Sequence, residues 1–256
     1  LGAAPKQDST DLRLCHVCSL PKGGGVNSYI SIEKQQFSTI DHAVGLIGKD
    51  FYMAKVDLRH AYRSVPVHPS NYDALGLKWH FEGDSEISYL VDTRLPFGGK
   101  SAPGIFHRLT QAVKRMMFRR GFPMVVVYLD DFLVLGRSFA DCQLAYDTIS
   151  ALLVDLGFTL SPSKLVPPTQ RLTFLGVEID SCTLSLSLPL AKLSELSSVV
   201  KSFLCRKQAT KRQLQRLAGK LNWACKVGYG GRTFLRRVLD LMNRLPLSRS
   251  RCRLSK

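Results

Sequence analysis

The stretch MVVVYLDDFLVLG, residues 124–136, is the part of the sequence that decides the fold. Two short apolar runs rich in valine flank two adjacent carboxylates, Asp130 and Asp131, and this pattern predicts a β-hairpin with the acids at its tip. Adjacent carboxylates repel each other unless a positive charge lies near them, and a divalent cation supplies that charge best. Taken alone, the pair is compatible with a metal site or with an ordinary acidic turn, where Asp is common.

A second stretch, FYMAKVDLRHAYRSVPVHP over residues 51–69, ends an apolar run at Asp57 and places Tyr62 five residues later. In open sheets, catalytic groups often follow the carboxyl end of a buried strand. Asp is also a frequent cap for the next turn of helix. Both interpretations of Asp57 stay open on this stretch alone.

The composition is that of a globular protein, with 256 residues, 45% apolar and 22% charged. No apolar run reaches the roughly 18 residues of a membrane span, and no signal-peptide pattern opens the chain. Seven cysteines, an odd number, do not indicate a disulfide framework, and Cys15-x-x-Cys18 has no second pair at zinc-site spacing. We therefore expect an intracellular protein, cytoplasmic or nuclear and not secreted. Because the sequence begins at Leu1, we also expect a fragment of a longer polypeptide.

The net charge of +16 is concentrated at one end of the chain. Residues 201–256 hold 16 Lys and Arg and a single acid, Asp240. Such a segment attracts polyanions, of which nucleic acid is the first choice, and the attraction weakens with salt. A solvated helical face or an unstructured tail would have the same composition.

The remaining pattern predicts a mixed body followed by a helical end. We expect a hairpin from strands at 74–79 and 86–93, helices at 101–120 and 139–156, and helical spacing over 37–47. LTFLGVEI, residues 172–179, is predicted to be a single strand, with residues 185–188 paired against it. After Pro189 we expect helices at 190–204, 210–223 and 232–245, and no further strand.

Five motifs in order give the chain a specific resemblance. They are Asp57 with Tyr62, LPFG at 95–98, YLDD at 128–131, LGFTLSPSK at 156–164 and FLG at 174–176. Together they resemble a reverse transcriptase, and within that family the texture is most similar to retrotransposon enzymes. The DIRS-type tyrosine-recombinase elements are the first choice and the gypsy-like LTR elements the second.

The resemblance implies an α+β protein with the right-hand polymerase fold, in which an antiparallel-sheet palm joins fingers and an α-helical thumb. It assigns residues 1–50 and 66–95 to the fingers and residues 51–65 and 96–188 to the palm. Residues 189–256 form a basic helical thumb that could be truncated. No ribonuclease H domain is expected in this chain.

The resemblance also implies the chemistry, an RNA-directed DNA polymerase of a retroelement polyprotein that adds dNTPs to a primer 3′-hydroxyl. Asp57, Asp130 and Asp131 match the catalytic aspartates, which hold two Mg²⁺ ions together with the backbone carbonyl of Leu58; Mn²⁺ can substitute. The residues assigned to the dNTP site are Lys6, Arg13, His60, Ala61, Tyr62, Phe97 and Lys164. Tyr62 is the expected steric gate against ribonucleotides, and Lys164 lies near the position of a general acid for pyrophosphate.

Further residues are assigned to the nucleic acid, a primer duplex with an RNA or DNA template. The primer grip comprises Tyr128, Phe174, Leu175 and Gly176, and the phosphate contacts comprise Lys211, Arg212, Arg216 and Lys220. No membrane partner is expected, and the oligomeric state is left open. A domesticated, inactive domain that only binds nucleic acid is the alternative, and an RNA polymerase of the same palm fold is disfavoured by Tyr62 and YLDD.

Overall fold

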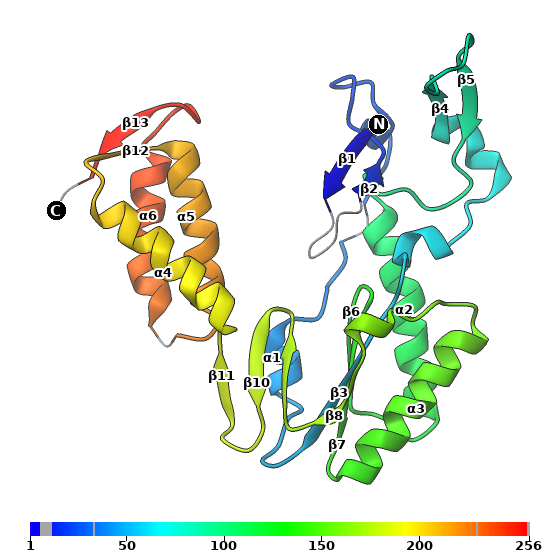
Figure 1. Cartoon of the computed structure of the whole chain (residues 1–256), viewed down its shortest axis with the longest axis vertical. Coiled ribbons are helices and arrows are strands. Elements are labelled where there is room, and N and C mark those ends of the chain that lie inside the picture. Colours follow the sequence, from blue (N-terminus) through cyan, green and yellow to red (C-terminus); the bar gives the residue numbers. More distant parts are fainter. Residues whose placement is uncertain (6–11, 33, 229, 255–256) are drawn as a thin grey trace. The chain divides into compact units, whose positions relative to one another are not determined.

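The computed structural model describes residues 1–5, 12–32, 34–228 and 230–254. The chain divides into two compact units, Leu1–Thr169 and Gln170–Lys256, which are described separately (Figure 1). Among the helices of the described residues, none combines the length and the apolar character that a bilayer span requires.

An antiparallel sheet of four strands forms the centre of the first unit. Its order is β6 (Val125–Tyr128), β7 (Asp131–Gly136), β3 (Tyr52–Asp57) and β8 (Val166–Thr169). The predicted hairpin at 124–136 is confirmed, because β6 and β7 pair from Val125 opposite Val134 to Tyr128 opposite Asp131. The strand that ends at Asp57 is confirmed as well, and it lies beside β7.

Two long helices, α2 (Ala102–Arg119) and α3 (Phe139–Asp155), pack against the sheet (Figure 1). α3 begins with a capping box in which Ser138 and Asp141 satisfy each other's backbone amides. The main core joins these helices to alternate residues of β3, β6 and β7, namely Ala54, Val56, Val125, Val127, Phe132 and Val134. Because strand side chains alternate between faces, Lys55, Asp57 and Asp131 are placed on the other face of the sheet.

Hairpins and short helices make up the rest of the first unit. β1 (Gly2–Pro5) pairs with β2 (Leu12–Cys15), and β4 (Gly76–Trp79) pairs with β5 (Ser88–Val91), which confirms the predicted hairpin at 74–93. The helical spacing over 37–47 yields only the short helix α1 (Ile40–Val44). The 3₁₀ helices are η1 (Val26–Ser28), η2 (Ala61–Ser64), η3 (Pro69–Leu75) and η4 (Pro162–Lys164).

The second unit opens with a sheet that corrects one prediction. LTFLGVEI is not one strand: β9 (Arg171–Phe174) and β10 (Val177–Asp180) form a hairpin, and β11 (Ser185–Ser187) pairs with β10. The two residues of the turn have left-handed backbone angles, with φ of 46° at Leu175 and 72° at Gly176. Two-residue hairpin turns require this conformation, and Leu in the first position conceals the signal that Asn-Gly would give.

The three predicted helices follow, as α4 (Leu190–Leu204), α5 (Lys211–Ala224) and α6 (Gly231–Asn243). The prediction of no further strand is wrong, because β12 (Gln208–Thr210) pairs with β13 (Arg251–Arg253). A small core of Ala209, Leu214 and Leu245 lies beside this pair. Each strand has three residues, too few for a period-2 pattern to stand out in the sequence.

Candidate functional site

Two carboxylates from distant parts of the chain meet on the face of the central sheet that points away from the main core. Asp57, the last residue of β3, lies directly opposite Asp131, the first residue of β7. Directly opposed residues of antiparallel strands have their side chains on the same face, about 5 Å apart at Cβ. The amide of Leu58 donates to the carbonyl of Asp130 at 3.2 Å, which ties the end of β3 to the hairpin turn. The proximity of Asp57 and the hairpin tip, predicted from sequence, is confirmed.

The turn that carries the aspartates holds Leu129 in the left-handed region, with φ of 54°. A residue with a branched side chain pays about 1 kcal/mol or more for this conformation. The tertiary structure therefore imposes this turn conformation, and the turn sets the direction of the Asp130 side chain.

Two lysines flank the two acids. The ammonium of Lys164, from η4, lies 3.1 Å from Oδ1 and 3.2 Å from Oδ2 of Asp57. The ammonium of Lys55, two residues before Asp57 on β3, lies 3.1 Å from Oδ1 of Asp131. The sequence analysis included Lys164 but missed Lys55. Its signal was available, because residues two apart on a strand share a face.

Asp57 is 3% exposed, and its environment favours the protonated form. Burial, followed by a hydrogen bond with the Asp131 carboxyl, raises the pKa of Asp57 to about 6, and Lys164 opposes this rise. The negative charge at this point is therefore only partly offset by the protein itself.

These features fit a divalent cation. Carboxylate oxygens are the ligands that hard cations prefer, and a cation would relieve the repulsion that raises the pKa of Asp57. Across the described residues, no three His, Cys, Asp or Glu side chains are grouped as a complete metal site, and this includes Cys15 and Cys18. The metal roles of Asp57, Asp130, Asp131 and the Leu58 carbonyl stay predictions.

The aromatic residue assigned to the sugar lies close to the acids in the chain. Left-handed His60, with φ of 59°, reverses the backbone after β3 and starts η2, which contains buried Ala61 and then Tyr62. The Tyr62 ring packs against Phe97 at a centroid distance of 5.0 Å and against Phe106 at 5.4 Å. The structure thus brings Tyr62 and Phe97 together, and their assignment to a dNTP site stays a prediction.

Two other residues assigned to the dNTP site come from the first thirteen residues of the chain. Lys6 lies outside the described residues, and of Arg13 only the backbone is described, in β2 opposite Ala4. Tyr128 ends β6 and is half-buried, with its ring 6.0 Å from that of Phe37. The functional assignments of these three residues stay predictions.

In the second unit, the FLG residues lie at the end of β9 and in the β9–β10 turn. Phe174 is fully buried, and Leu175 and Gly176 occupy the turn itself. A Cβ at Gly176 would lie 2.3 Å from the Lys192 ammonium and 2.8 Å from the Trp223 ring. Glycine is therefore needed here for both its backbone angles and the close approach of α4 and α5.

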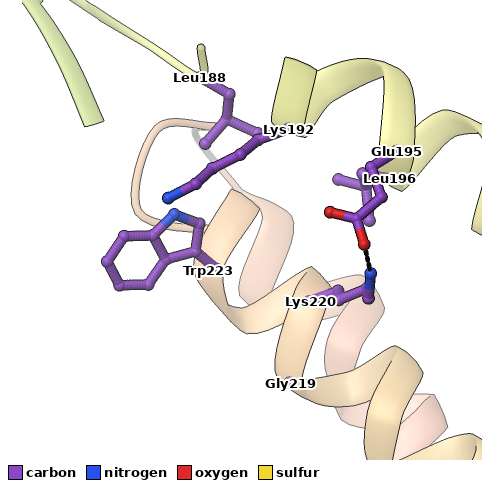
Figure 2. Close-up of a pocket in the computed structure, with 7 residues that line it drawn as sticks. All are labelled: Leu188, Lys192, Glu195, Leu196, Gly219, Lys220 and Trp223. Atoms are coloured by element: carbon purple, nitrogen blue, oxygen red, sulfur yellow. Dashed lines mark hydrogen bonds and ion pairs between the residues drawn. The ribbon is translucent and has the colours of Figure 1, made fainter. Parts of the chain in front are cut away.

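A pocket of about 470 Å³ lies between α4 and α5 (Figure 2). Its lining residues are Leu188, Lys192, Glu195, Leu196, Gly219, Lys220 and Trp223. The Trp223 ring has two ammonium groups over it, that of Lys192 at 5.2 Å from the centroid and that of Lys226 at 4.1 Å. The sequence analysis did not single out Trp223, although it is one of only two tryptophans in the chain.

The four basic residues assigned to phosphates are not equivalent. Lys220 pairs with Glu195, and the Lys211 ammonium donates to the carbonyl of Leu245 at 2.5 Å. Arg212 and Arg216 are exposed on α5. The arginines are therefore better placed to meet a ligand than the lysines are.

Comparison with known proteins identifies the family. The sequence profile of the reverse transcriptase (RNA-dependent DNA polymerase) family matches residues 12–179, more than half of the chain. The chain belongs to the reverse transcriptase family. Members are RNA-directed DNA polymerases, a class of nucleotidyltransferase, and they generally use divalent metal ions.

Viral polyproteins are among the relatives of this reverse transcriptase chain. It is 30% identical over 136 residues to the Gag-Pol polyprotein of avian reticuloendotheliosis virus, covering 52% of the chain and 12% of the polyprotein. It is 28% identical over 155 residues to Polyprotein P3 of Commelina yellow mottle virus, covering 59% of the chain and 8% of the polyprotein. The chain thus spans about a tenth of the length of these relatives.

Solved reverse transcriptases share its fold. A foamy viral protease-reverse transcriptase in complex with double-stranded DNA matches with a TM-score of 0.77 at 17% identity, covering 96% of this chain and 39% of that one. The same viral protein in complex with an RNA/DNA hybrid matches with a TM-score of 0.68 at 16% identity, covering 93% and 30%. The predicted polymerase fold, α+β with an antiparallel sheet, is confirmed. The residue bounds of fingers, palm and thumb stay predictions.

Proposed function

We propose that this chain catalyses RNA-directed DNA synthesis as part of a retroelement polyprotein, adding dNTPs to a primer 3′-hydroxyl. The observation that carries the proposal is the opposition of Asp57 and Asp131 across β3 and β7. Two carboxylates brought this close, with a third next to them in the turn, suit a reaction driven by positioning and charge.

The acids and the lysines have separate parts in this proposal. Asp57, Asp130, Asp131 and the Leu58 carbonyl would hold two Mg²⁺ ions, or Mn²⁺ in their place. When bound, these ions would activate the primer hydroxyl and stabilise the leaving pyrophosphate. The Lys164 ammonium lies 3.1 Å from Asp57 Oδ1. It is therefore close enough to the acids to donate a proton to the pyrophosphate or to stabilise its negative charge.

The dNTP would lie between the β1–β2 hairpin and η2. Lys6 and Arg13 would bind the triphosphate, Arg as a planar fork and Lys as a point charge. His60 and Ala61 would contact the nucleotide. Tyr62, packed on Phe97, would lie under the sugar. A ribose 2′-hydroxyl would then collide with the Tyr62 ring.

Residues of each unit would contact the substrate duplex, among them Tyr128 in the first unit. The similarity in fold to a polymerase solved with double-stranded DNA and with an RNA/DNA hybrid supports nucleic acid as the partner. Phe174, Leu175 and Gly176 would support the primer end, and α5 would contact phosphates without reading sequence. We further propose a retrotransposon of DIRS type, or a gypsy-like element in second place, acting inside the cell.

Primer extension tests the proposed function. The chain should extend a DNA primer on an RNA template with dNTPs and Mg²⁺, and Asp130→Asn should abolish the extension because a metal ligand is lost. Duplex affinity of the variant, measured by fluorescence anisotropy, should stay close to that of the unmodified chain. A chain that binds the duplex but extends no primer under these conditions would instead be the inactive, nucleic-acid-binding domain.

Sugar selection tests the gate separately. Tyr62→Ala should accept rNTPs with a rate approaching that for dNTPs, because the ring that blocks the 2′-hydroxyl is gone. The measurement is the ratio of kcat/KM for a dNTP and its rNTP. Tyr72→Ala is a matched control, since Tyr72 lies in η3. An unchanged ratio in Tyr62→Ala would mean that Tyr62 is not the steric gate against ribonucleotides.

A further inference from the structure

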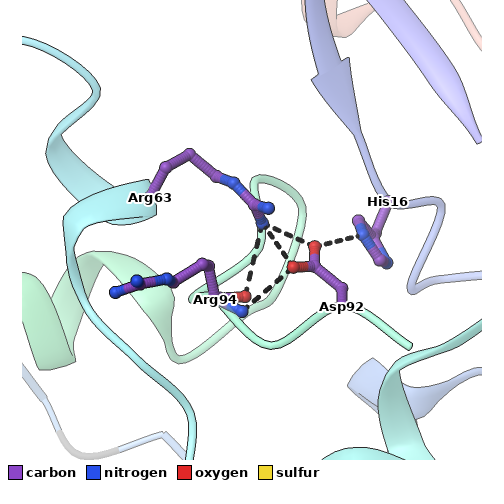
Figure 3. A network of polar contacts seen from close by, with 4 residues as sticks. All are labelled: His16, Arg63, Asp92 and Arg94. Carbon is purple, nitrogen blue, oxygen red and sulfur yellow. Dashed lines mark hydrogen bonds and ion pairs between the residues drawn. The ribbon is translucent and has the colours of Figure 1, made fainter. Parts of the chain in front are cut away.

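Three segments of the first unit meet at one buried carboxylate, Asp92, which follows β5 (Figure 3). Its Oδ2 lies 2.7 Å from Nε2 of His16. The Arg63 guanidinium donates through Nη1 to both carboxylate oxygens, at 2.7 Å and 2.5 Å. The backbone amide of Arg94 donates to Oδ1 at 3.0 Å. Asp92 is 8% exposed, so these contacts replace most of its water.

One of these segments continues the β1–β2 hairpin. His16 follows β2 directly, and its amide donates to the carbonyl of Phe97 at 2.7 Å. The adjacent Gly98 has φ of 104°, and a Cβ there would lie 2.0 Å from the His16 carbonyl oxygen. The chain at the end of β2 therefore packs closely against Phe97 and Gly98, and the His16 side chain contacts Asp92.

The second segment contains the proposed sugar gate. Arg63 is the neighbour of Tyr62 in η2, and the Tyr62 ring packs on Phe97. Arg63 also donates to the carbonyl of Arg94 at 3.4 Å, and the Arg94 side chain donates to the carbonyl of Ser64 at 3.3 Å. Asp92 thus joins the strand that carries Arg13 to the turn that carries Tyr62.

The energetics favour a positional part for this carboxylate. Burial acts to raise the pKa of Asp92, but the hydrogen bonds from Arg63 and the Arg94 amide, with the charges of Arg63 and His16, outweigh it and lower the pKa. The group is therefore held as an anion. Buried ion pairs contribute little net stability relative to apolar residues, whereas a hydrogen-bonded polar network restricts the geometry of the segments that it joins.

We propose that Asp92 is a positioning residue for the nucleotide pocket, fixing β2 against the Tyr62–Phe97 pair. It would act through His16 and Arg63 and would not touch the nucleotide. The proposal rests on the proposed function, because it takes Tyr62 and Arg13 as the two sides of a dNTP site. Asp92 lies outside the five motifs that resemble the family. The proposal attributes the selectivity of the site for dNTPs over rNTPs to the distance between β2 and the Tyr62–Phe97 pair.

The test is steady-state primer extension by the full chain carrying Asp92→Asn, which removes the charge and keeps the shape. Misplacing β2 should raise the KM for dNTP about tenfold, while kcat stays within about twofold because the aspartates are unchanged. Discrimination against rNTPs should fall as well. Asp84→Asn, an exposed acid between β4 and β5, is the matched control and should behave like the unmodified chain.

A double-mutant cycle separates positioning from loss of folded protein. Arg63→Met should raise KM as Asp92→Asn does, and the double variant should be no worse than either, since both break one unit. His16→Gln leaves the Arg63 pair in place, so it reports on the β2 side even if Asp92→Asn folds poorly; thermal melting of each variant identifies that case. His16→Gln should raise KM with kcat preserved.

The outcomes are distinguishable. A fall in kcat with unchanged KM across these variants would mean less folded enzyme and would overturn the positioning proposal alone. Unchanged KM and unchanged sugar discrimination in His16→Gln and Asp92→Asn would overturn it too. An unmodified chain that extends no primer would overturn the proposed function, and the Asp92 proposal with it.

Discussion

The negative charge of the Asp57 carboxylate is only partly compensated by the residues around it. Its pKa in the folded chain is raised from 3.8 to about 6, with burial as the first cause. A carboxyl with a raised pKa favours folding below the unfolded pKa, and this contribution is lost as pH rises through about 6. Above that pH the ionised group destabilises the metal-free fold, by at most about 3 kcal/mol for a rise of this size.

We therefore expect Asp57→Asn to raise the free energy of unfolding at pH 7.5 in EDTA, by about 1–2 kcal/mol once the lost contact with Lys164 is included. The difference should shrink towards zero near pH 3, below the unfolded pKa of 3.8, where Asp57 is mostly protonated in both states. Urea denaturation at the two pH values measures it. Asp92→Asn should have the opposite sign at pH 7.5, because the pKa of Asp92 is lowered. A less stable Asp57→Asn at pH 7.5 would contradict this account of the charges.

At the residue scale, the three aspartates were predicted from the sequence, whereas Lys55 and Asp92 were not. Asp57, Asp130 and Asp131 stand in patterns that chemistry makes conspicuous. Lys55 could have been found from its place two residues before Asp57 on the same strand. Asp92 could not, because its importance comes from His16 and Arg63, which are far away in the chain. Contacts of that kind follow from strand register and loop packing, which the sequence does not display.

At the scale of elements, the strands and helices with long periodic patterns were predictable. The β6–β7 hairpin, β3 and helices α2 to α6 all follow from apolar spacing and caps. The errors lie in short elements. The β9–β10 hairpin was taken as one strand because Leu175-Gly176 lacks the usual turn residues, and β12 and β13 pair across about forty residues of helix.

Two glycines of the second unit should respond oppositely to alanine. Gly176→Ala should lower the free energy of unfolding by about 2 kcal/mol or more, since φ is 72° and the new Cβ meets Trp223. Gly219→Ala on α5 should be neutral or raise it by up to about 1 kcal/mol, because nothing lies within 4 Å and Ala favours helix. Thermal and urea unfolding compare the pair. Equal effects of the two substitutions would mean that the β9–β10 turn is not packed as described.

At the scale of the whole molecule, charge is the property that should govern binding. The net charge of +16, with 16 basic residues after position 200, predicts duplex binding that weakens steeply with salt. Substituting exposed Arg212 and Arg216 together by Gln should reduce the slope of log K against log salt by about two. The matched pair Lys211→Gln and Lys220→Gln should change it less, because these lysines have internal partners. Equal slopes for both double variants would contradict a phosphate role for the arginines.

The central claim is that Asp57, Asp130 and Asp131 together hold divalent cations at the end of β3 and the β6–β7 turn. Its most direct test is a Mn²⁺ titration followed by electron paramagnetic resonance, with a chain-terminated primer on template and a dNTP present. The unmodified chain should bind two Mn²⁺ ions per chain, and Asp57→Asn and Asp130→Asn should each lose that binding while Asp84→Asn retains it. Identical Mn²⁺ binding by all four proteins would contradict the account.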